Sequence, residues 1–312
     1  MNLFKEKVMK KLIGTFLFLS IILSSFAQDR FDLFYFAGNY NLMQTTDANP
    51  DENGELGIMA QLKIPIVFEN NNVWYSQIDY QYFSVFNEFN ATTVNPIDKL
   101  NIHGIIIKTG YVHRFDEKKS LQVLFSPRLM TDFNASFSNS VQLGGVLLFE
   151  KIKNENYTWK VGAFYNQDFF GPYLVPVFDV NWKITSKLRL SGLLPIYGAL
   201  YMEPSEKLQY GLHFIGLTTS YRINEPNFEN YYIDRRSIDV STFTKLHVFD
   251  NVFFTARAGY SLSRDYGLFD EDDKITIGLP LVNIGDDRTR ANEEFSGSPF
   301  VHLRLTYSIP VN

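Results

Sequence analysis

Residues 55–68 read ELGIMAQLKIPIVF, and every second side chain from Leu56 to Phe68 is apolar. The residues between them are mixed and include Glu55 and Lys63. An alternation with period two indicates a β-strand with one apolar and one mixed face. The stretch can cross a bilayer when tilted, since a spanning strand needs roughly 9–11 residues. Much of the chain repeats this design, so the whole interpretation rests on it.

The first residues have the features of an export signal. A positively charged start (Lys5, Lys7, Lys10, Lys11) precedes an apolar core over residues 12–26, and Ser25-Phe26-Ala27 is a small-x-small cleavage pattern. A transmembrane anchor is the alternative, but this core is shorter than the ~20 residues that a spanning helix needs. We therefore expect residues 1–27 to be a signal peptide and residues 28–312 to form one barrel domain.

Composition excludes several classes of protein. The chain contains no Cys, so disulfides, a lipoprotein anchor and thiolate metal sites are impossible. The whole chain carries a formal charge of −5, of which residues 1–27 contribute +3, so the expected mature chain is acidic and nucleic acid is disfavoured as a partner. Aromatic residues are 16% of the chain, which fits rings gathered at two membrane interfaces, although a large soluble β-protein could also be this aromatic.

The order of short and long connections predicts the topology. Strands are predicted at 31–45, 55–68, 73–87, 100–115, 120–133, 140–152, 157–168, 175–184, 188–194, 196–202, 208–223, 236–248, 252–265 and 300–309. Tight turns are predicted at 69–72, 116–119, 153–156, 185–187, 204–207 and 249–251, and longer loops at 46–54, 88–99, 169–174, 224–235 and 266–297. Every tight turn follows an even-numbered strand if Pro195 separates two short strands, which gives fourteen strands. Twelve full strands and an irregular hairpin are the alternative.

These features favour an all-β fold: a single transmembrane, antiparallel, up-and-down β-barrel with short periplasmic turns and longer outer loops. A closed sheet gives every backbone N–H and C=O a partner in hydrocarbon without leaving an edge. A soluble all-β protein is the alternative. Soluble strands usually run about 5–6 residues, whereas many of the predicted strands have 12–15.

Residues 171–207 read GPYLVPVFDVNWKITSKLRLSGLLPIYGALYMEPSEK, and the chain closes with a strand rich in Arg, Gly and Tyr, a long acidic loop and a final strand. In these parts it resembles the outer-membrane β-barrels of unknown function numbered six-two-six-eight. The resemblance implies a barrel in the cell outer membrane and no established activity. Outer-membrane lipid, lipopolysaccharide and the barrel-assembly machinery are then the expected partners. The last residue is Asn312 rather than the aromatic usual in the assembly signal, which Tyr307 and Ile309 would have to supply internally.

Charged residues of both signs fall on the mixed faces of the predicted strands and are candidates for the lumen. Lone charges there would be costly, so we expect them to pair or to line water. One interpretation is a polar channel whose field selects solutes, and the other is a lumen that salt bridges hold shut. These residues are Lys63, Asp79, Lys108, Arg128, Glu150, Lys160, Asp179, Lys183, Arg189, Arg257 and Arg304.

Catalytic and metal sites have weaker support. A membrane-embedded lipid hydrolase would need a Ser, a His and an orienting group in reach, but His103, His113, His213, His247 and His302 have no recognisable spacing to Ser126, Ser220 or Ser261. The acidic stretches GLFDEDDK and GDDR (267–274 and 285–288) lack the ligand spacing of a calcium loop and favour a solvated loop. We expect no catalytic residues, no bound metal and no cofactor.

The sequence thus favours a non-enzymatic outer-membrane barrel of a gram-negative cell, in which small polar or amphiphilic solutes pass passively through the lumen. A closed structural or surface-binding barrel is the second hypothesis. The lipid hydrolase is the third.

Overall fold

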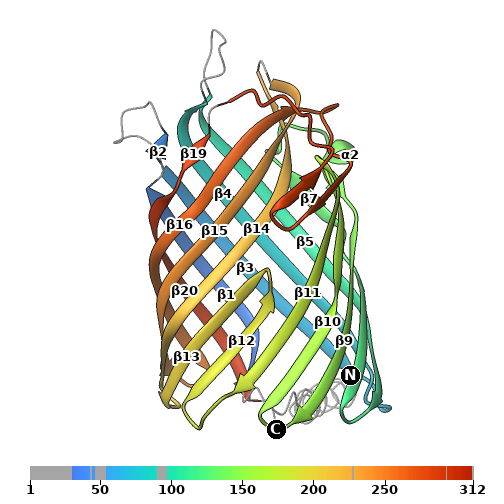
Figure 1. Cartoon of the computed structure of the whole chain (residues 1–312), viewed down its shortest axis with the longest axis vertical. Coiled ribbons are helices and arrows are strands. Elements are labelled where there is room, and N and C mark those ends of the chain that lie inside the picture. The colour runs from blue at the N-terminus through green and yellow to red at the C-terminus, as the bar shows by residue number, and fades with distance from the viewer. Residues whose placement is uncertain are drawn as a thin grey trace, which may run out of the picture.

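The computed structural model describes residues 30–42, 44–45, 54–89, 97–226, 228–292 and 294–310. The predicted signal peptide, most of the first two predicted loops and the chain end at Asn312 lie outside these residues. Within them, one antiparallel sheet curls round into a barrel (Figure 1).

Fourteen strands run around the barrel in the described ranges, and two of them are interrupted. The fourteen-strand prediction is confirmed, and the twelve-strand alternative is wrong. In barrel order the strands are β1 (Arg30–Leu42), β3 (Gly54–Val67), β4 (Val73–Phe89), β5 (Ile97–Asp116), β6 with β7 (Lys119–Phe125, Arg128–Thr131), β9 with β8 (Gly144–Asn154, Val141–Gln142), β10 (Tyr157–Asp168), β11 (Gly171–Lys183), β12 (Leu188–Leu194), β13 (Tyr197–Ser205), β14 (Leu208–Glu225), β15 (Phe228–Phe249), β16 (Val252–Asp270) and β20 (Ser298–Pro310).

The first and last strands close the sheet. β1 pairs with β3 along one side and with β20 along the other, in a register that runs from Arg30 opposite Pro310 to Asn41 opposite Phe300. Closure supplies β1 and β20 with hydrogen-bond partners on both sides, as a barrel in hydrocarbon requires.

The two ends of the barrel differ. All six predicted tight turns gather at one end, the short-turn end, where β1 begins and β20 ends (Figure 1). The opposite, long-loop end carries the hairpin of β17 (Ile277–Leu279) and β18 (Val282–Ile284), the pair of β2 (Gln44–Thr45) with β19 (Phe295–Ser296), and the short helix α2 (Phe137–Ser140). No described helix combines the length and apolar character needed to cross a membrane.

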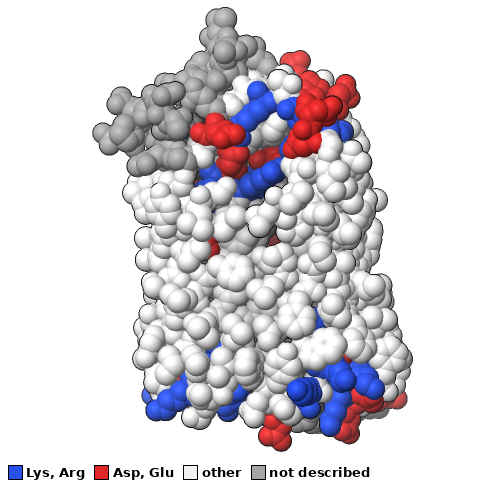
Figure 2. Space-filling view, viewed as in Figure 1, with Lys and Arg blue, Asp and Glu red and all other residues white. Residues whose placement is uncertain are grey.

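The predicted alternation along residues 55–68 appears in the side-chain exposures. Leu56, Leu62, Ile64 and Ile66 are exposed on the outer wall, whereas Lys63 between them faces inward and is half-buried. Figure 2 shows the consequence on the face in view: charge gathers at the two ends, and a wide, nearly uncharged belt lies between them. A closed sheet with an apolar outer belt is a barrel built to span a lipid bilayer.

Several predicted loop boundaries are wrong. The predicted aromatic loop at 169–174 is a turn at 169–170, after which β11 begins at Gly171. The predicted loop at 224–235 is mostly strand, because β14 continues to Glu225 and β15 starts at Phe228. β16 continues likewise to Asp270. These strands extend beyond the apolar belt, where alternation of apolar and polar residues no longer marks them.

Two predicted strands are interrupted. The strand predicted at 120–133 breaks at Ser126 and Pro127, since proline has no N–H to donate to a ladder. Its neighbour, predicted at 140–152, breaks at Leu143.

The wall of strands has one seam. The hairpin β12–β13 is short, so its last pairs with its neighbours are Leu194 with Phe178 of β11 and Tyr197 with Ile215 of β14. Toward the long-loop end from there, residues 171–177 of β11 and residues 216–222 of β14 do not pair with each other. Each segment instead makes one short parallel pairing, Tyr173 with Gly278 of β17 and Arg222 with Thr131 of β7. We call these two segments the side seam; in Figure 1 β11 and β14 diverge around the hairpin.

Candidate functional site

The half of the lumen at the short-turn end is lined by charged side chains, and we call it the vestibule. It is defined by Asp32, Lys63, Asp79, Lys108, Glu150, Lys160, Arg189, Glu203, Lys245, Arg257 and Arg304. Most of these residues are paired across neighbouring strands. Lys108 Nζ lies 2.9 Å from Asp79 Oδ2, and Lys160 Nζ lies 2.7 Å from Glu150 Oε2.

A second group of vestibule charges centres on Asp32, which the sequence analysis missed. Arg304 Nη2 lies 3.0 Å and Lys245 Nζ 3.8 Å from the Asp32 carboxylate, which joins β1, β15 and β20. Arg189 of β12 pairs with Glu203 of β13, a residue just beyond the strand predicted at 196–202. Asp32, Lys245, Arg304 and Glu203 remain half-buried in these pairs, whereas Arg189 is buried.

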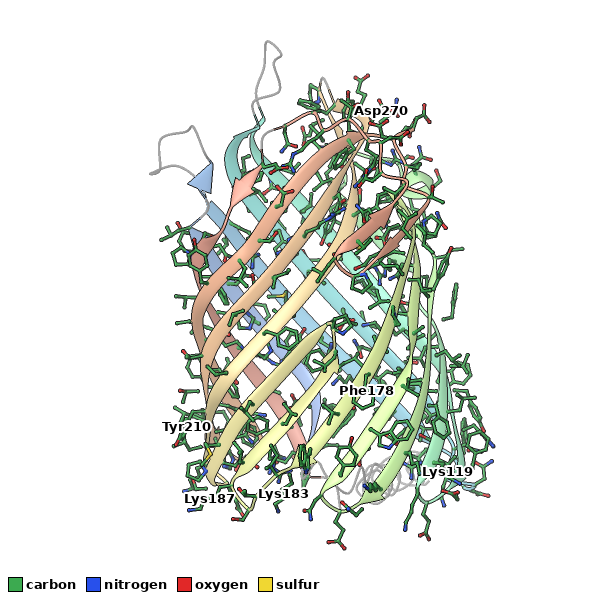
Figure 3. The ribbon with its side chains drawn as sticks, viewed as in Figure 1. Lys119, Phe178, Lys183, Lys187, Tyr210 and Asp270 are labelled. Atoms are coloured by element: carbon green, nitrogen blue, oxygen red, sulfur yellow. The ribbon has the colours of Figure 1, made fainter. Side chains whose placement is uncertain are left out.

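The other predicted lumen residues are spread over the barrel. Asp179 is an electrostatic neighbour of Lys160, and Lys63 lies over the Phe31 ring at 5.3 Å. Figure 3 shows Lys183 at the short-turn end. Arg128 lies on β7, in the opposite half.

The half of the lumen at the long-loop end is built differently, around the fully buried Glu55. Its carboxylate accepts from Arg235 Nη2 at 3.1 Å, from Arg264 Nη1 at 2.6 Å and from the Tyr266 hydroxyl. Arg264 also pairs with Asp239. We call Glu55, Arg235, Asp239, Arg264 and Tyr266 the buried ion cluster. It ties β3 to β15 and β16, which are separated by β20 and β1 in barrel order.

Apolar side chains pack against this cluster. The Arg235 guanidinium carbon lies 4.0 Å from the centre of the Phe83 ring. The fully buried apolar side chains of this half, which we call the upper core, are Phe83, Val85, Leu100, Ile102, Met130, Tyr221, Ile223 and Ile233. In this half of the lumen the charged groups are paired and the apolar side chains are fully buried, so little room is left for water. The half therefore resembles the close-packed interior of a soluble domain.

Sequence reasoning missed the buried ion cluster for a specific reason. Along β16 the inward positions are odd-numbered up to Ser261, but the pairing with β15 shifts register between Ile238 and Asp239. The extra residue on β16 moves Arg264, at an even position, to the inside. A β-bulge of this kind reverses the parity that the alternation argument depends on. Its presence left no clear signal in the sequence.

Side-chain contacts replace the backbone ladder across the side seam. Tyr173 of β11 is an electrostatic neighbour of Thr218 of β14. Nearer the long-loop end, the Ser220 hydroxyl donates to Asp168 Oδ1 at 3.1 Å and accepts the Phe169 N–H at 2.8 Å. Inside the barrel the seam is bordered by apolar groups, which are Phe164, Val175, Val177, Leu193 and Ile196.

The β17–β18 hairpin and the acidic loop lie beside the seam. β17 pairs with β11 through Gly278 and Tyr173. Lys274 Nζ donates to the Phe169 carbonyl at 2.6 Å, and burial together with Arg222 lowers the pKa of this lysine. The acidic residues are tied to basic neighbours, as Arg222 is to Glu271 at 2.9 Å. Within the described residues, no three His, Asp or Glu side chains are grouped as a metal site.

The predicted hydrolase residues do not come together in the part of the chain that is described. His103 Nδ1 bonds with the Tyr80 hydroxyl at 3.1 Å, and His247 bonds with the Asp250 carbonyl. The Ser261 hydroxyl donates to Asp239. None of the histidine rings in the described ranges is hydrogen bonded to a serine hydroxyl.

Comparisons with solved structures return membrane barrels of low sequence identity. The chain is similar to the TodX monoaromatic hydrocarbon channel deltaS2 mutant at 12% identity and a TM-score of 0.40, with 91% of this chain and 90% of that chain covered. It is similar to the NanC porin at 8% identity and a TM-score of 0.37, with coverages of 88% and 100%. It is also similar to the Salmonella typhi outer membrane phospholipase (OMPLA) dimer with bound calcium at 11% identity and a TM-score of 0.32, with coverages of 93% and 98%.

These likenesses concern the fold alone. No curated protein sequence matches the chain. A family model described as domain of unknown function (DUF6268) matches residues 24–275, which is most of the chain. The protein therefore belongs to the DUF6268 family of domains of unknown function.

Proposed function

We propose that this protein is a non-enzymatic barrel of the outer membrane of a gram-negative cell that passes small amphiphilic solutes passively. Solutes enter the vestibule from the short-turn end and leave through the side seam. The observation that carries this proposal is the contrast between the two ways out of the vestibule. The axial way meets the buried ion cluster and the upper core, whereas the lateral way meets a part of the wall where β11 and β14 share no backbone ladder and each has only a single parallel pairing with another strand.

The proposed orientation follows the general rule for such barrels. Short turns face the periplasm and long loops face the outside. The vestibule then opens to the periplasm, and the side seam meets the outer part of the membrane. Outer-membrane lipid, lipopolysaccharide and the barrel-assembly machinery are the partners that this location implies.

We expect the side seam to be the part of the wall whose opening requires the least free energy. In hydrocarbon an unpaired N–H or C=O costs several kcal/mol, so paired strands stay paired. Residues 171–177 and 216–222 share no such ladder with each other. The neutral side chains of Tyr173 and Thr218 are neighbours across the seam, and a contact of this kind contributes no more than a neutral hydrogen bond, about 1 kcal/mol. Separating the two segments therefore costs far less than separating any two strands paired along their length.

The lining supports an amphiphilic solute rather than a fully polar one. The vestibule offers charged and hydrogen-bonding groups, while Val175, Val177 and Ile196 border the seam. A solute with one polar and one apolar end would be matched at both places. A sugar or an inorganic ion would lose its hydration shell at the apolar seam without gaining hydrogen bonds in its place.

The test uses vesicles that contain the purified chain and entrapped radiolabelled octanesulfonate, which carries a permanent charge. Efflux above the rate of protein-free vesicles is expected. In the double variant Tyr173→Cys and Thr218→Cys, a short bismaleimide that links the two thiols should return efflux to the protein-free rate. The native chain has no Cys, so the reagent has no other thiol target.

The matched control places the same link on the intact wall. Val240→Cys and Tyr260→Cys are opposite each other on β15 and β16, and both native side chains are exposed on the outside. This link should leave efflux unchanged. Efflux that survives the seam link would rule out lateral exit.

A closed structural or surface-binding barrel is the second candidate, and the filled long-loop half of the lumen favours it. It predicts no octanesulfonate efflux and no current at any voltage in planar bilayers. That pair of results would end the passage proposal.

A further inference from the structure

The vestibule contains a cluster of basic side chains, and no acidic side chain of the described residues pairs with it. Its centre is Arg257 on β16, which lies opposite His302 on β20 and opposite Phe243 on β15. His213 of β14 contacts the same Phe243 ring edge-on, with ring centres 6.5 Å apart. Four neighbouring strands thus bring two imidazoles and a guanidinium to one patch of the inner wall.

Arg257 has no acidic side chain among its electrostatic neighbours, whereas Lys63, which also makes no ion pair among the described residues, has Asp32 and Asp79 as neighbours. Lys108, Lys160 and Arg304 each lie within 3.0 Å of a carboxylate. Arg257 makes no ion pair or hydrogen bond within the described ranges, and its charged neighbour is another cation, Arg304. The electrostatic neighbours of His213 and His302 are likewise all basic.

Two buried nitrogen atoms in this cluster are left without a hydrogen-bond partner. They are Arg257 Nε and His302 Nε2. Buried polar atoms in native proteins nearly always have a hydrogen-bond partner, and a guanidinium without a counter-charge is among the most costly groups to leave unpaired. At the same time Arg257, His213 and His302 are only half-buried as whole side chains, so they remain accessible from the lumen.

We propose that Arg257, His213 and His302 form an oxyanion-binding site in the vestibule. The guanidinium presents two parallel N–H groups that match the two oxygens of a carboxylate, sulfonate or phosphate group. Each neutral imidazole donates through one ring N–H. The site is suited to anions and not to metal cations, because Arg257 repels a cation placed between the two imidazoles.

The shared chemistry of the ligand is a compact oxyanion, either a free inorganic ion or the head of an amphiphile. The site does not depend on the proposed passage, since an anion could be held there whether or not it crosses the membrane. Binding is therefore measured on the full chain in a non-ionic detergent, where no transport takes place.

Isothermal titration uses three probes: sodium sulfate, sodium octanesulfonate and octanol, which has the same chain length without the charge. We expect sulfate, octanesulfonate or both to bind at one site and octanol not to bind there. In Arg257→Met the affinity should fall by at least about 10-fold, the effect of losing charge-assisted hydrogen bonds. Lys183→Met is the control, because it removes a cation at the short-turn end, away from the cluster, and should leave the affinity unchanged.

The pattern of binding among the probes shows whether the ligand is a free inorganic oxyanion or the head group of an amphiphile. Binding of both anions indicates a general oxyanion site, binding of octanesulfonate alone an amphiphile site, and binding of sulfate alone an inorganic one. Each must be lost in Arg257→Met. Binding that is equal in the wild type and Arg257→Met, or no binding of either anion, would overturn the proposal.

A measurement of thermal stability distinguishes a loss of anion binding in Arg257→Met from a loss of folded protein. Removing an unpaired charge should leave the thermal stability of Arg257→Met unchanged or raised in anion-free buffer, while sulfate should stabilise the wild type more than the variant. The comparison between the two proteins removes the general stabilising effect of sulfate on folded chains. A destabilised Arg257→Met that sulfate protects as well as the wild type would show that Arg257 is structural.

Discussion

The two halves of the lumen accommodate inward-facing charged side chains in different ways. Both contain inward-facing charges on β3, β15 and β16, yet Glu55 in the long-loop half is fully buried between two arginines, whereas Asp32 in the vestibule pairs with Arg304 at partial exposure. In the first half, charges are neutralised and covered by an apolar core. In the second, they stay accessible and cations outnumber acids. One barrel wall therefore encloses a packed core at one end and a region lined by partly exposed charges at the other.

This contrast predicts the largest effect in chemical accessibility. Gln61→Cys in the vestibule should react readily with a small water-soluble methanethiosulfonate, because Gln61 is half-buried on the inner face beside Asp79. Val85→Cys in the upper core should not react in the native barrel and should react only after unfolding, because Val85 is 0% exposed. Equal labelling of the two variants would mean that water fills both halves.

The next largest effect concerns one substitution made in each half. Glu55→Gln leaves Arg235 and Arg264 without their shared counter-charge in a buried site and should cost about 3–5 kcal/mol of unfolding free energy. Glu150→Gln removes a pair with Lys160 that is partly exposed, so its cost should be about 1 kcal/mol or less. Guanidinium unfolding in detergent, followed by circular dichroism, measures both. Similar losses would contradict the assignment of a dry and a wet half.

A glycine at the side seam gives a smaller effect. Gly171 begins β11 with a φ of 127°, and an added Cβ would lie 2.7 Å from the Ile275 carbonyl oxygen. Gly171→Ala should therefore cost about 1–3 kcal/mol and loosen the contact of the acidic loop with the seam. Gly38→Ala is the control, since its Cβ would meet only an ordinary contact at 3.7 Å. Limited proteolysis of the loop and unfolding in detergent would detect the difference, and equal behaviour of the two variants would remove the strain argument.

How far the sequence predicts this structure depends on the half. The alternation along residues 55–68 correctly predicted that this stretch is a strand, which of its faces is apolar, and that the sheet closes into a barrel. It did so because lipid favours apolar side chains at every second position. At the long-loop end both faces of a strand can be buried or polar, so the alternation disappears and β15 was predicted eight residues too short at its start. Charged residues could be assigned to the inner face by parity, but parity gives no partner. The role of Asp32 therefore became visible only when the structure brought β1 together with β15 and β20. Glu203 was missed because the predicted strand ended at residue 202, one position before it.

The smallest effect is expected in the acidic loop, outside both halves. Hydrogen bonds from the Arg288 guanidinium, at 2.8 Å, hold the pKa of Asp286 below its ordinary value of 3.8. A depressed carboxyl pKa means that the pair stabilises the loop fully above pH 3.8 and that this contribution is lost as pH falls toward the folded-state pKa. The pair is partly exposed, so the effect should be below about 1 kcal/mol. Hydrogen exchange of residues 274–290 should show protection that falls below pH 3.8 in the wild type and that is lower and independent of pH over this range in Asp286→Asn. An identical pH profile in the two proteins would mean that Arg288 holds the loop through Asp234, 3.1 Å away, instead.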